Sequence, residues 1–192
     1  ARWLEATHAV TIHRSTHVHA VGDGRLETTR GRFTAERIVV CPGDERLALF
    51  ADRFAALGIA RVRLQMLKVM PLDPVPTLPA AVMSDLSLVR YLGYAALAEA
   101  EALARRLERE EAAKLAQGIH LIAVQGADGG LVVGDSHHHE PAPSPFAAAH
   151  VEDLILAELD AVLDLGARRV VERWQGTYAH LPDRRCVIDA PA

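Results

Sequence analysis

Two Asp-Gly turn signals constrain the fold of this chain more than any other feature. The segments Gly22-Asp23-Gly24 and Ala127-Asp128-Gly129-Gly130 each separate two runs with strand character. Asp-Gly steps supply the positive φ that a tight hairpin requires. Each turn therefore predicts a pair of antiparallel strands, residues 10–21 with 25–30 and residues 119–125 with 131–133.

The remaining periodicities predict further strands and three helices. Alternation predicts strands at residues 33–40, 61–71, 167–174 and 186–188, with one or two short strands within 81–92. Helical spacing predicts a helix after Asp44, a long one over residues 95–117, and a third from Ser144-Pro145 onward. Strand hairpins with helices inserted between them indicate an α+β fold, a mixed and largely antiparallel sheet with helices packed on it.

Composition narrows the class of protein. The net charge is −4 over 192 residues, with acids and bases interspersed, so nothing indicates a nucleic-acid partner. Apolar stretches are broken by charge well short of the ~18 residues that a membrane span needs. Cys41 and Cys186 follow or lie in apolar runs, so we expect two buried, reduced thiols in a cytoplasmic protein. The oligomeric state is not indicated.

The run G-D-S-H-H-H-E raises the question of a metal site. We expect this polar run to form a loop, in which His137, His138 and His139 could converge, with Glu140 and His150 nearby. On a strand, at most two of the three histidines would share a face. Zinc sites need three or four ligands, and no H-E-x-x-H or C-x-x-C spacing is present. We therefore expect no metal, and a metal-dependent hydrolase using the His137–His139 cluster stays an alternative.

Four motifs, taken in order, carry a resemblance to a known family. They are R-I-V-V-C-P-G-D at 37–44, R-V-R-L-Q-M-L-K at 61–68, D-G-G-L-V-V-G-D-S-H at 128–137, and R-W-Q-G-T-Y-A-H-L-P-D-R-R-C-V-I-D at 173–189. Their order and spacing resemble the FAD-dependent amine oxidoreductases of the glycine oxidase, sarcosine oxidase and D-amino-acid oxidase superfamily. Within it, the chain looks most like a bacterial branch proposed to act on aminophosphonates.

The resemblance implies a domain plan and an activity. Residues 1–45 would belong to the FAD-binding domain, 46–180 to the substrate-binding domain, and 181–192 to the return into the FAD-binding domain. Because the family's G-x-G-x-x-G unit is absent, the chain would be the central portion of a longer enzyme, inactive alone and weak in FAD binding. The enzyme would oxidise a small amine, an amino acid or aminophosphonate, to an imine by hydride transfer to flavin. A non-catalytic small-ligand-binding domain is the alternative from another class.

Cofactor-binding residues carry over position by position. Val18 matches the position whose backbone meets the adenine, and Gly43 matches the glycine of the family's A-x-G-x-W element. The family's tryptophan is replaced here by Asp44-Glu45-Arg46. Tyr178 matches a tyrosine over the flavin. The cysteine that holds the flavin covalently in sarcosine oxidases would fall at Gly176, which excludes that attachment.

A substrate pocket is predicted from the resemblance together with side-chain chemistry. Ser136 and His137 match the place of an active-site histidine in sarcosine oxidases, and with Tyr178 they are the catalytic candidates. An imidazole can accept an amine proton or pair with an anionic group. The substrate-binding candidates are His139, Arg90, Tyr91 and Tyr94, of which Arg90 could hold a carboxylate or phosphonate. Alternatives are a solvated loop for the histidines, core packing for the tyrosines and a surface ion pair for Arg90.

Overall fold

The computed structural model describes the chain except at residues 1, 46, 141–143, 182–185 and 189–192. The chain divides into two compact units, Ala1–Ile59 and Ala60–Ala192, which are called unit 1 and unit 2 below. Both units contain antiparallel sheet, and helices pack on the larger one, so the predicted α+β class is confirmed. Among the described residues, no helix has the length and apolar character needed to span a membrane.

Unit 1 is built around a small antiparallel meander. The strands β1, β2 and β3 pair in that order, and the predicted hairpin turn at Asp23 and Gly24 is confirmed, with φ of 42° and 68°. A Cβ on Gly24 would lie 2.9 Å from the carbonyl oxygen of Ala35, so this turn requires glycine. The elements are α1 (Arg2–Ala6), β1 (Val18–Gly22), β2 (Arg25–Thr28), β3 (Gly31–Thr34) and α2 (Ala51–Ala56).

Several predicted strands of unit 1 are shorter than the apolar pattern indicates. Residues 10–17 and 35–40 lie outside any strand, although the prediction extended strands through both segments. The reason is a missing second layer. Among the described residues of this unit, Thr28 alone is buried, so the alternating side chains have no core to enter. The same absence explains why Cys41 is exposed, and Cys186 in unit 2 is exposed as well; the prediction of buried thiols was wrong.

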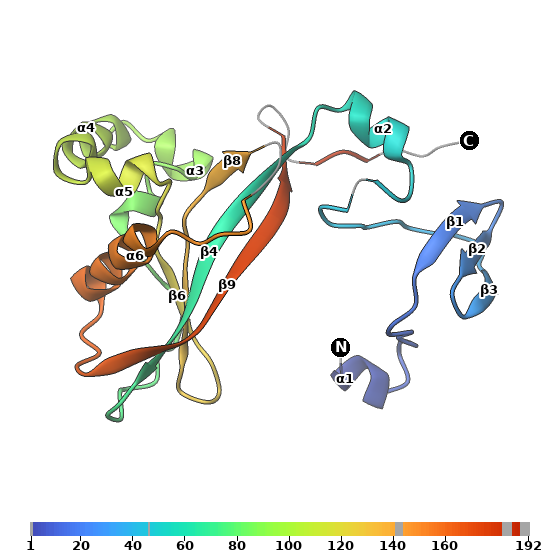
Figure 1. Cartoon of the computed structure of the whole chain (residues 1–192), viewed down its shortest axis with the longest axis horizontal. Helices are drawn as coiled ribbons and strands as arrows, with labels where there is room; N and C mark the ends of the chain where they lie inside the picture. The colour runs from blue at the N-terminus through green and yellow to red at the C-terminus, as the bar shows by residue number, and fades with distance from the viewer. Residues whose placement is uncertain (1, 46, 141–143, 182–185, 189–192) are drawn as a thin grey trace. The chain divides into compact units, whose positions relative to one another are not determined.

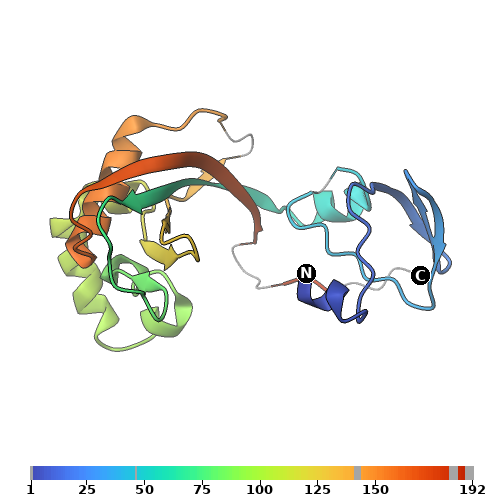
Figure 2. The ribbon, with the colours of Figure 1, turned by 90° about the horizontal axis from the view of Figure 1, so that it is seen from below.

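Unit 2 is a six-stranded antiparallel sheet organised on one long strand, β4 (Ala60–Pro71). One edge of β4 pairs with β9 (Arg168–His180) along its whole length, and the two strands run side by side in both ribbon views (Figures 1 and 2). The other edge pairs first with β8 (His138–Glu140) and then with β7 (Leu131–Gly134). The sheet continues through β6 (Ile122–Gln125) to β5 (Val82–Met83).

The alternation of β4 places its side chains on two faces. Leu67 and Val69 are fully buried, and they lie opposite Val133 and Leu131 of β7. The same face continues through Gln65, which is also buried. Burial alternates with a period of two along this strand, which is paired at both edges. This explains why the alternation in the sequence predicted the strand correctly.

Helices cover this core, and α6 (Ala149–Val162) contributes the buried side chains of Val151, Ile155 and Leu159. The predicted single helix over residues 95–117 was wrong. It is divided into α3 (Leu92–Ala95), α4 (Ala100–Glu110) and α5 (Ala112–Ala116), after a short 3₁₀ helix at Asp85–Ser87. The break between α4 and α5 lies at Glu111, whose φ and ψ of −125° and 26° are not helical. Lys114 then forms a 2.6 Å ion pair with Glu158 of α6.

Three smaller predictions were also wrong or fall outside the described residues. The histidine run was predicted as loop, but β8 pairs His138 and His139 with Arg63 and Val62 of β4. The last helix begins at Ala149 instead of following Ser144-Pro145. Residues 186–188 form no strand, and the turn predicted just before them lies largely in undescribed residues.

Candidate functional site

The β6–β7 hairpin brings two buried histidines together just beyond its paired residues. The register pairs Ile122 with Gly134, and its continuation lets the backbone N–H of His120 donate to the carbonyl of Asp135 at 3.3 Å. The rings of His120 and His137 stack with centroids 4.2 Å apart and planes 29° apart. Their Nε2 atoms lie 3.1 Å from each other. The hairpin thus brings the backbones of these two histidines together.

The carboxylate of Asp135 completes what we call the histidine cluster, defined as His120, Asp135 and His137. Its Oδ1 lies 3.6 Å from His120 Nε2 and 3.8 Å from His137 Nδ1. Only 4%, 14% and 5% of the three side chains is exposed, in sequence order. Among the residues that the structure describes, neither Asp135 Oδ1 nor His120 Nδ1 has a hydrogen-bond partner, which is unusual for buried polar atoms. The three residues are also a group whose ligand atoms could hold a metal ion.

Gly118 sets the orientation of His137. The ring Nδ1 lies 3.2 Å from the carbonyl oxygen of Gly118, so Nδ1–H donates and Nε2 presents its lone pair toward His120. Gly118 has a φ of +60°, and a Cβ there would lie 2.7 Å from the carbonyl oxygen of His137. The glycine that ends α5 therefore also permits the close approach of the histidine strand.

Burial dominates the electrostatics of the cluster. Desolvation, aided by the positive charge of Arg90, lowers the pKa of His120 to about 4. Desolvation, then His120 and Arg90, lower the pKa of His137 to about 3, against the hydrogen bond to Gly118. Desolvation raises the pKa of Asp135 to about 6, although Arg90 opposes this. At neutral pH both imidazoles are therefore uncharged, and each offers a ring-nitrogen lone pair to a hydrogen-bond donor or a ligand.

Three of the predicted residues surround the cluster. The ring of Tyr91 meets His120 edge-on with centroids 5.6 Å apart, and the ring of Tyr178 meets His137 edge-on at 6.0 Å. Burial, then the charge of Asp135, raises the pKa of the Tyr91 hydroxyl. Tyr91 is 40% exposed, so the cluster borders the surface on this side. The structure brings His137, Arg90, Tyr91 and Tyr178 near one another, and their role in a pocket stays a prediction.

Three other predicted pocket residues lie apart from this arrangement. Ser136 is fully buried, and its hydroxyl accepts a hydrogen bond from the backbone N–H of Gln65 at 3.2 Å. His139 is exposed and packs edge-on against His180 of β9, with centroids 4.8 Å apart. Tyr94 is 51% exposed on α3.

The two predicted cofactor residues lie in unit 1. Val18 begins β1 and is partly buried. Gly43 has a φ of +66°, and a Cβ placed on it would have no atom within 4 Å. Several other glycines share this openness, so it does not single out Gly43, and its role in cofactor binding stays a prediction.

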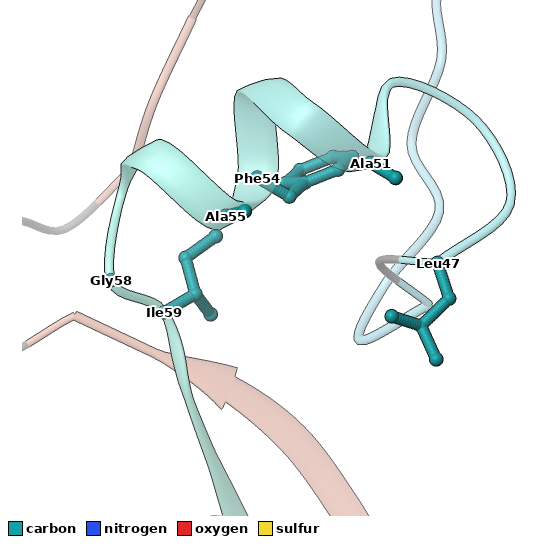
Figure 3. Close-up of a pocket in the computed structure, with 6 residues that line it drawn as sticks. All are labelled: Leu47, Ala51, Phe54, Ala55, Gly58 and Ile59. Carbon is teal, nitrogen blue, oxygen red and sulfur yellow. The ribbon is translucent and has the colours of Figure 1, made fainter.

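Two surface hollows are separate from the histidine cluster. One lies in unit 1 and is lined by apolar side chains with no titratable group, as Figure 3 shows for Leu47, Phe54 and Ile59. The other lies in unit 2 between the 72–80 loop and the end of α6, and Gln125 and Asp164 are its polar members. Neither hollow is lined by a residue of the histidine cluster, so the buried titratable groups of the cluster lie outside both.

Sequence reasoning missed His120 and Asp135, although both left a signal. His120 is a single polar residue between Ile119 and Leu121, both buried, in a run predicted as a strand. The predicted hairpin pairs Gln125 with Leu131, and extending that antiparallel register places His120 opposite Ser136, between Asp135 and His137. That register brings the two backbones together, but it places His120 and Ser136 on one face and Asp135 and His137 on the other, so the turn alone does not predict the cluster.

Comparison with known proteins identifies the fold. The crystal structure of glycine oxidase from Geobacillus kaustophilus is similar, with a TM-score of 0.51 and 18% sequence identity. The likeness covers 88% of this chain and 37% of the glycine oxidase chain. This chain therefore has an α+β fold that corresponds to a part of a glycine oxidase. No protein-family model and no curated protein matches it.

Proposed function

We propose that this chain is the substrate-side portion of a FAD-dependent amine oxidoreductase, and that the histidine cluster with Arg90, Tyr91 and Tyr178 forms a wall of its substrate site. The observation that carries the proposal is the convergence of these residues, several distant in sequence, within a fold similar to part of a glycine oxidase. Residues 1–45 would belong to the FAD-binding domain and residues 46–180 to the substrate-binding domain.

The charges of the wall favour a substrate with an amine and an anionic group. The positive charge of Arg90 interacts with all three members of the cluster, because it acts to lower the pKa values of His120, Asp135 and His137. A guanidinium binds a carboxylate or phosphonate through paired hydrogen bonds. An amino acid or an aminophosphonate is therefore the substrate class we expect.

The neutral histidines have a separate role in this proposal. Hydride leaves the carbon next to an uncharged amine, and a buried neutral imidazole favours that form because it accepts a hydrogen bond from the amine N–H and gains no proton itself. The Nδ1–H of His137 donates to Gly118, which fixes the orientation of this ring. The edge-on ring of Tyr178 helps to exclude water from this side.

FAD would supply the hydride acceptor when bound. The chain offers this cofactor an open backbone at Gly43 and the small sheet that contains Val18. It contains no G-x-G-x-x-G segment, so the residues present support a contribution to FAD binding without the pyrophosphate cradle. We therefore assign the chain to the substrate side and expect it to bind FAD weakly by itself.

The test uses the polypeptide that carries this chain. We expect the purified protein to show the visible absorption bands of bound flavin, and to release hydrogen peroxide or reduce an artificial acceptor when amino acids or aminophosphonates are added. Arg90→Gln should raise KM for substrates with an anionic group and leave KM for uncharged amines little changed. Absence of flavin from the purified protein would contradict the proposal, as would equal effects of Arg90→Gln on both substrate classes.

A further inference from the structure

We propose that His120, Asp135 and His137 form a binding site for a divalent transition-metal ion, with a remaining coordination position open beside Arg90. The sequence led us to expect no metal, because the only candidate ligands near one another in the sequence were the histidines at 137–139 and their neighbours. The structure separates those three residues, since His139 packs against His180, and brings His120 to His137 instead. The inference goes beyond the proposed function, because metal binding here requires neither flavin nor an amine.

The separations between the ligand atoms suit a small tetrahedral ion. Two ligands that are each ~2.0–2.1 Å from a tetrahedral zinc ion lie roughly 3.3 Å from each other. His120 Nε2 lies 3.1 Å from His137 Nε2 and 3.6 Å from Asp135 Oδ1. The three ligand atoms lie within 4.8 Å of one another. Small side-chain shifts would therefore be enough to surround an ion.

The surroundings of His137 match those of metal-binding histidines. Such histidines usually donate the second ring N–H to a carbonyl or carboxylate, which fixes the tautomer and turns the free nitrogen toward the ion. The Nδ1 of His137 does this with Gly118, and its Nε2 lone pair points into the cluster. The packing of Gly118 against the backbone of His137 keeps this geometry in place.

Asp135 supplies the second, independent observation. Its Oδ1 is buried and accepts no hydrogen bond from any described residue, although a buried acceptor left without a partner costs about 1–3 kcal/mol. Coordination to a cation would satisfy this oxygen.

The ligand set and its charge indicate which ion would bind. Two imidazoles and one carboxylate suit zinc and neighbouring first-row divalent ions, and three protein ligands leave a position for water or an anion. Arg90 opposes a cation electrostatically and would attract an anion to that position. We therefore expect binding that is weaker than at a closed four-ligand site and that strengthens when a small anion binds with the metal.

The experiment is a Co²⁺ titration of the chelator-treated protein, followed by displacement with Zn²⁺. Four-coordinate Co²⁺ gives intense visible bands, which report binding without any enzymatic assay. We expect the wild type to develop these bands in a saturable titration that fits one Co²⁺ per chain. His120→Ala, His137→Ala and Asp135→Asn should each lower the affinity roughly tenfold or more. The matched control, His139→Ala, should leave the titration unchanged.

A further variant keeps the test valid if removal of a buried ligand unfolds the protein. Arg90 is only partly buried, and Arg90→Gln should raise the Co²⁺ affinity several-fold by removing the opposing charge. Circular dichroism establishes that each variant is folded. The proposal is overturned if the wild type gives no visible bands, if folded His120→Ala titrates like the wild type, if His139→Ala abolishes the bands, or if Arg90→Gln leaves the affinity unchanged. Flavin content, measured on the same samples, reports separately on the proposed function.

Discussion

Strand patterns in the sequences of units 1 and 2 lead to very different amounts of buried core. In unit 2, Leu67, Leu131 and Ile155 are among the fully buried side chains of a core that the sheet and α6 share. In unit 1, among the residues that the structure describes, no hydrophobic side chain is buried. The difference shows that hairpin chemistry is sufficient to form local strand pairs, whereas a second layer is needed to extend them and bury their side chains.

Separating the two units would test this comparison with the largest effect. We expect residues 60–192 alone to unfold in one cooperative transition, because they retain the whole core. Residues 1–59 alone should show no cooperative transition. Thermal circular dichroism and amide dispersion in NMR spectra measure both outcomes, and cooperative unfolding of the 1–59 fragment would refute the contrast.

A matched pair of leucine substitutions sharpens the comparison. Leu67→Ala removes a fully buried side chain opposite Val133 and should lower the free energy of unfolding by about 4 kcal/mol. Leu47→Ala in unit 1 removes a side chain that is 84% exposed and should change it by less than about 0.5 kcal/mol. Urea unfolding of both variants gives the two values, and similar losses in both would contradict the account.

Ion pairs provide the next contrast. Lys114→Ala leaves the buried carboxylate of Glu158 without its 2.6 Å partner, so we expect a loss of about 3 kcal/mol in unfolding free energy. Arg14→Ala removes the exposed pair with Glu5 in unit 1, and this should leave the main unfolding transition unchanged. The same urea experiment measures both, and a Lys114→Ala protein as stable as the wild type would show that the pair is not needed.

The smallest predicted effect is a pH dependence confined to unit 2. The pKa values of His120 and His137 in the folded protein are about 4 and about 3, below the ordinary histidine pKa of 6.5. As the pH falls, these histidines bind protons in the unfolded chain before they do so in the folded protein. The free energy of unfolding is therefore highest above pH 6.5 and decreases as the pH falls toward 4. Asp135 has the opposite sign, because its raised pKa of about 6 stabilises the fold at lower pH.

Two imidazoles outweigh one carboxyl, so the unfolding free energy should fall by on the order of 1–2 kcal/mol between pH 7 and pH 5. Replacing both histidines with glutamine should reverse the sign of this dependence by leaving Asp135. His139→Gln, an exposed control, should follow the wild type. An unchanged slope in the double variant would mean that the pair does not titrate as described.

The predictability of the fold follows the same division. The strand at 61–71 and the turn at 127–130 were predictable because alternation and Asp-Gly chemistry agree with the tertiary structure there. The break at Glu111 was not predictable, because the alanine-rich run contains no residue that typically ends a helix there. Lys114, just after the break, forms an ion pair with Glu158, which is distant in sequence. The cysteines were misjudged because an apolar neighbourhood in sequence does not supply a covering layer in space.

The site was predictable in part for a related reason. His137, Arg90, Tyr91 and Tyr178 were chosen by chemistry and resemblance, and the structure brings them together. Whether they act on a substrate stays a prediction. His120 was missed because its role depends on strand register, which the composition of a short motif does not reveal.

The most direct test of the central claim is an anaerobic mixing experiment on the polypeptide that carries this chain. An amino acid or aminophosphonate is added, and the visible flavin bands are followed in the wild type, His137→Ala and His139→Ala. We predict that the bands bleach in the wild type and in His139→Ala, and that bleaching in His137→Ala is slower by roughly a hundredfold or more. Bleaching at the wild-type rate in His137→Ala would contradict the account, as would a protein that contains no flavin to bleach.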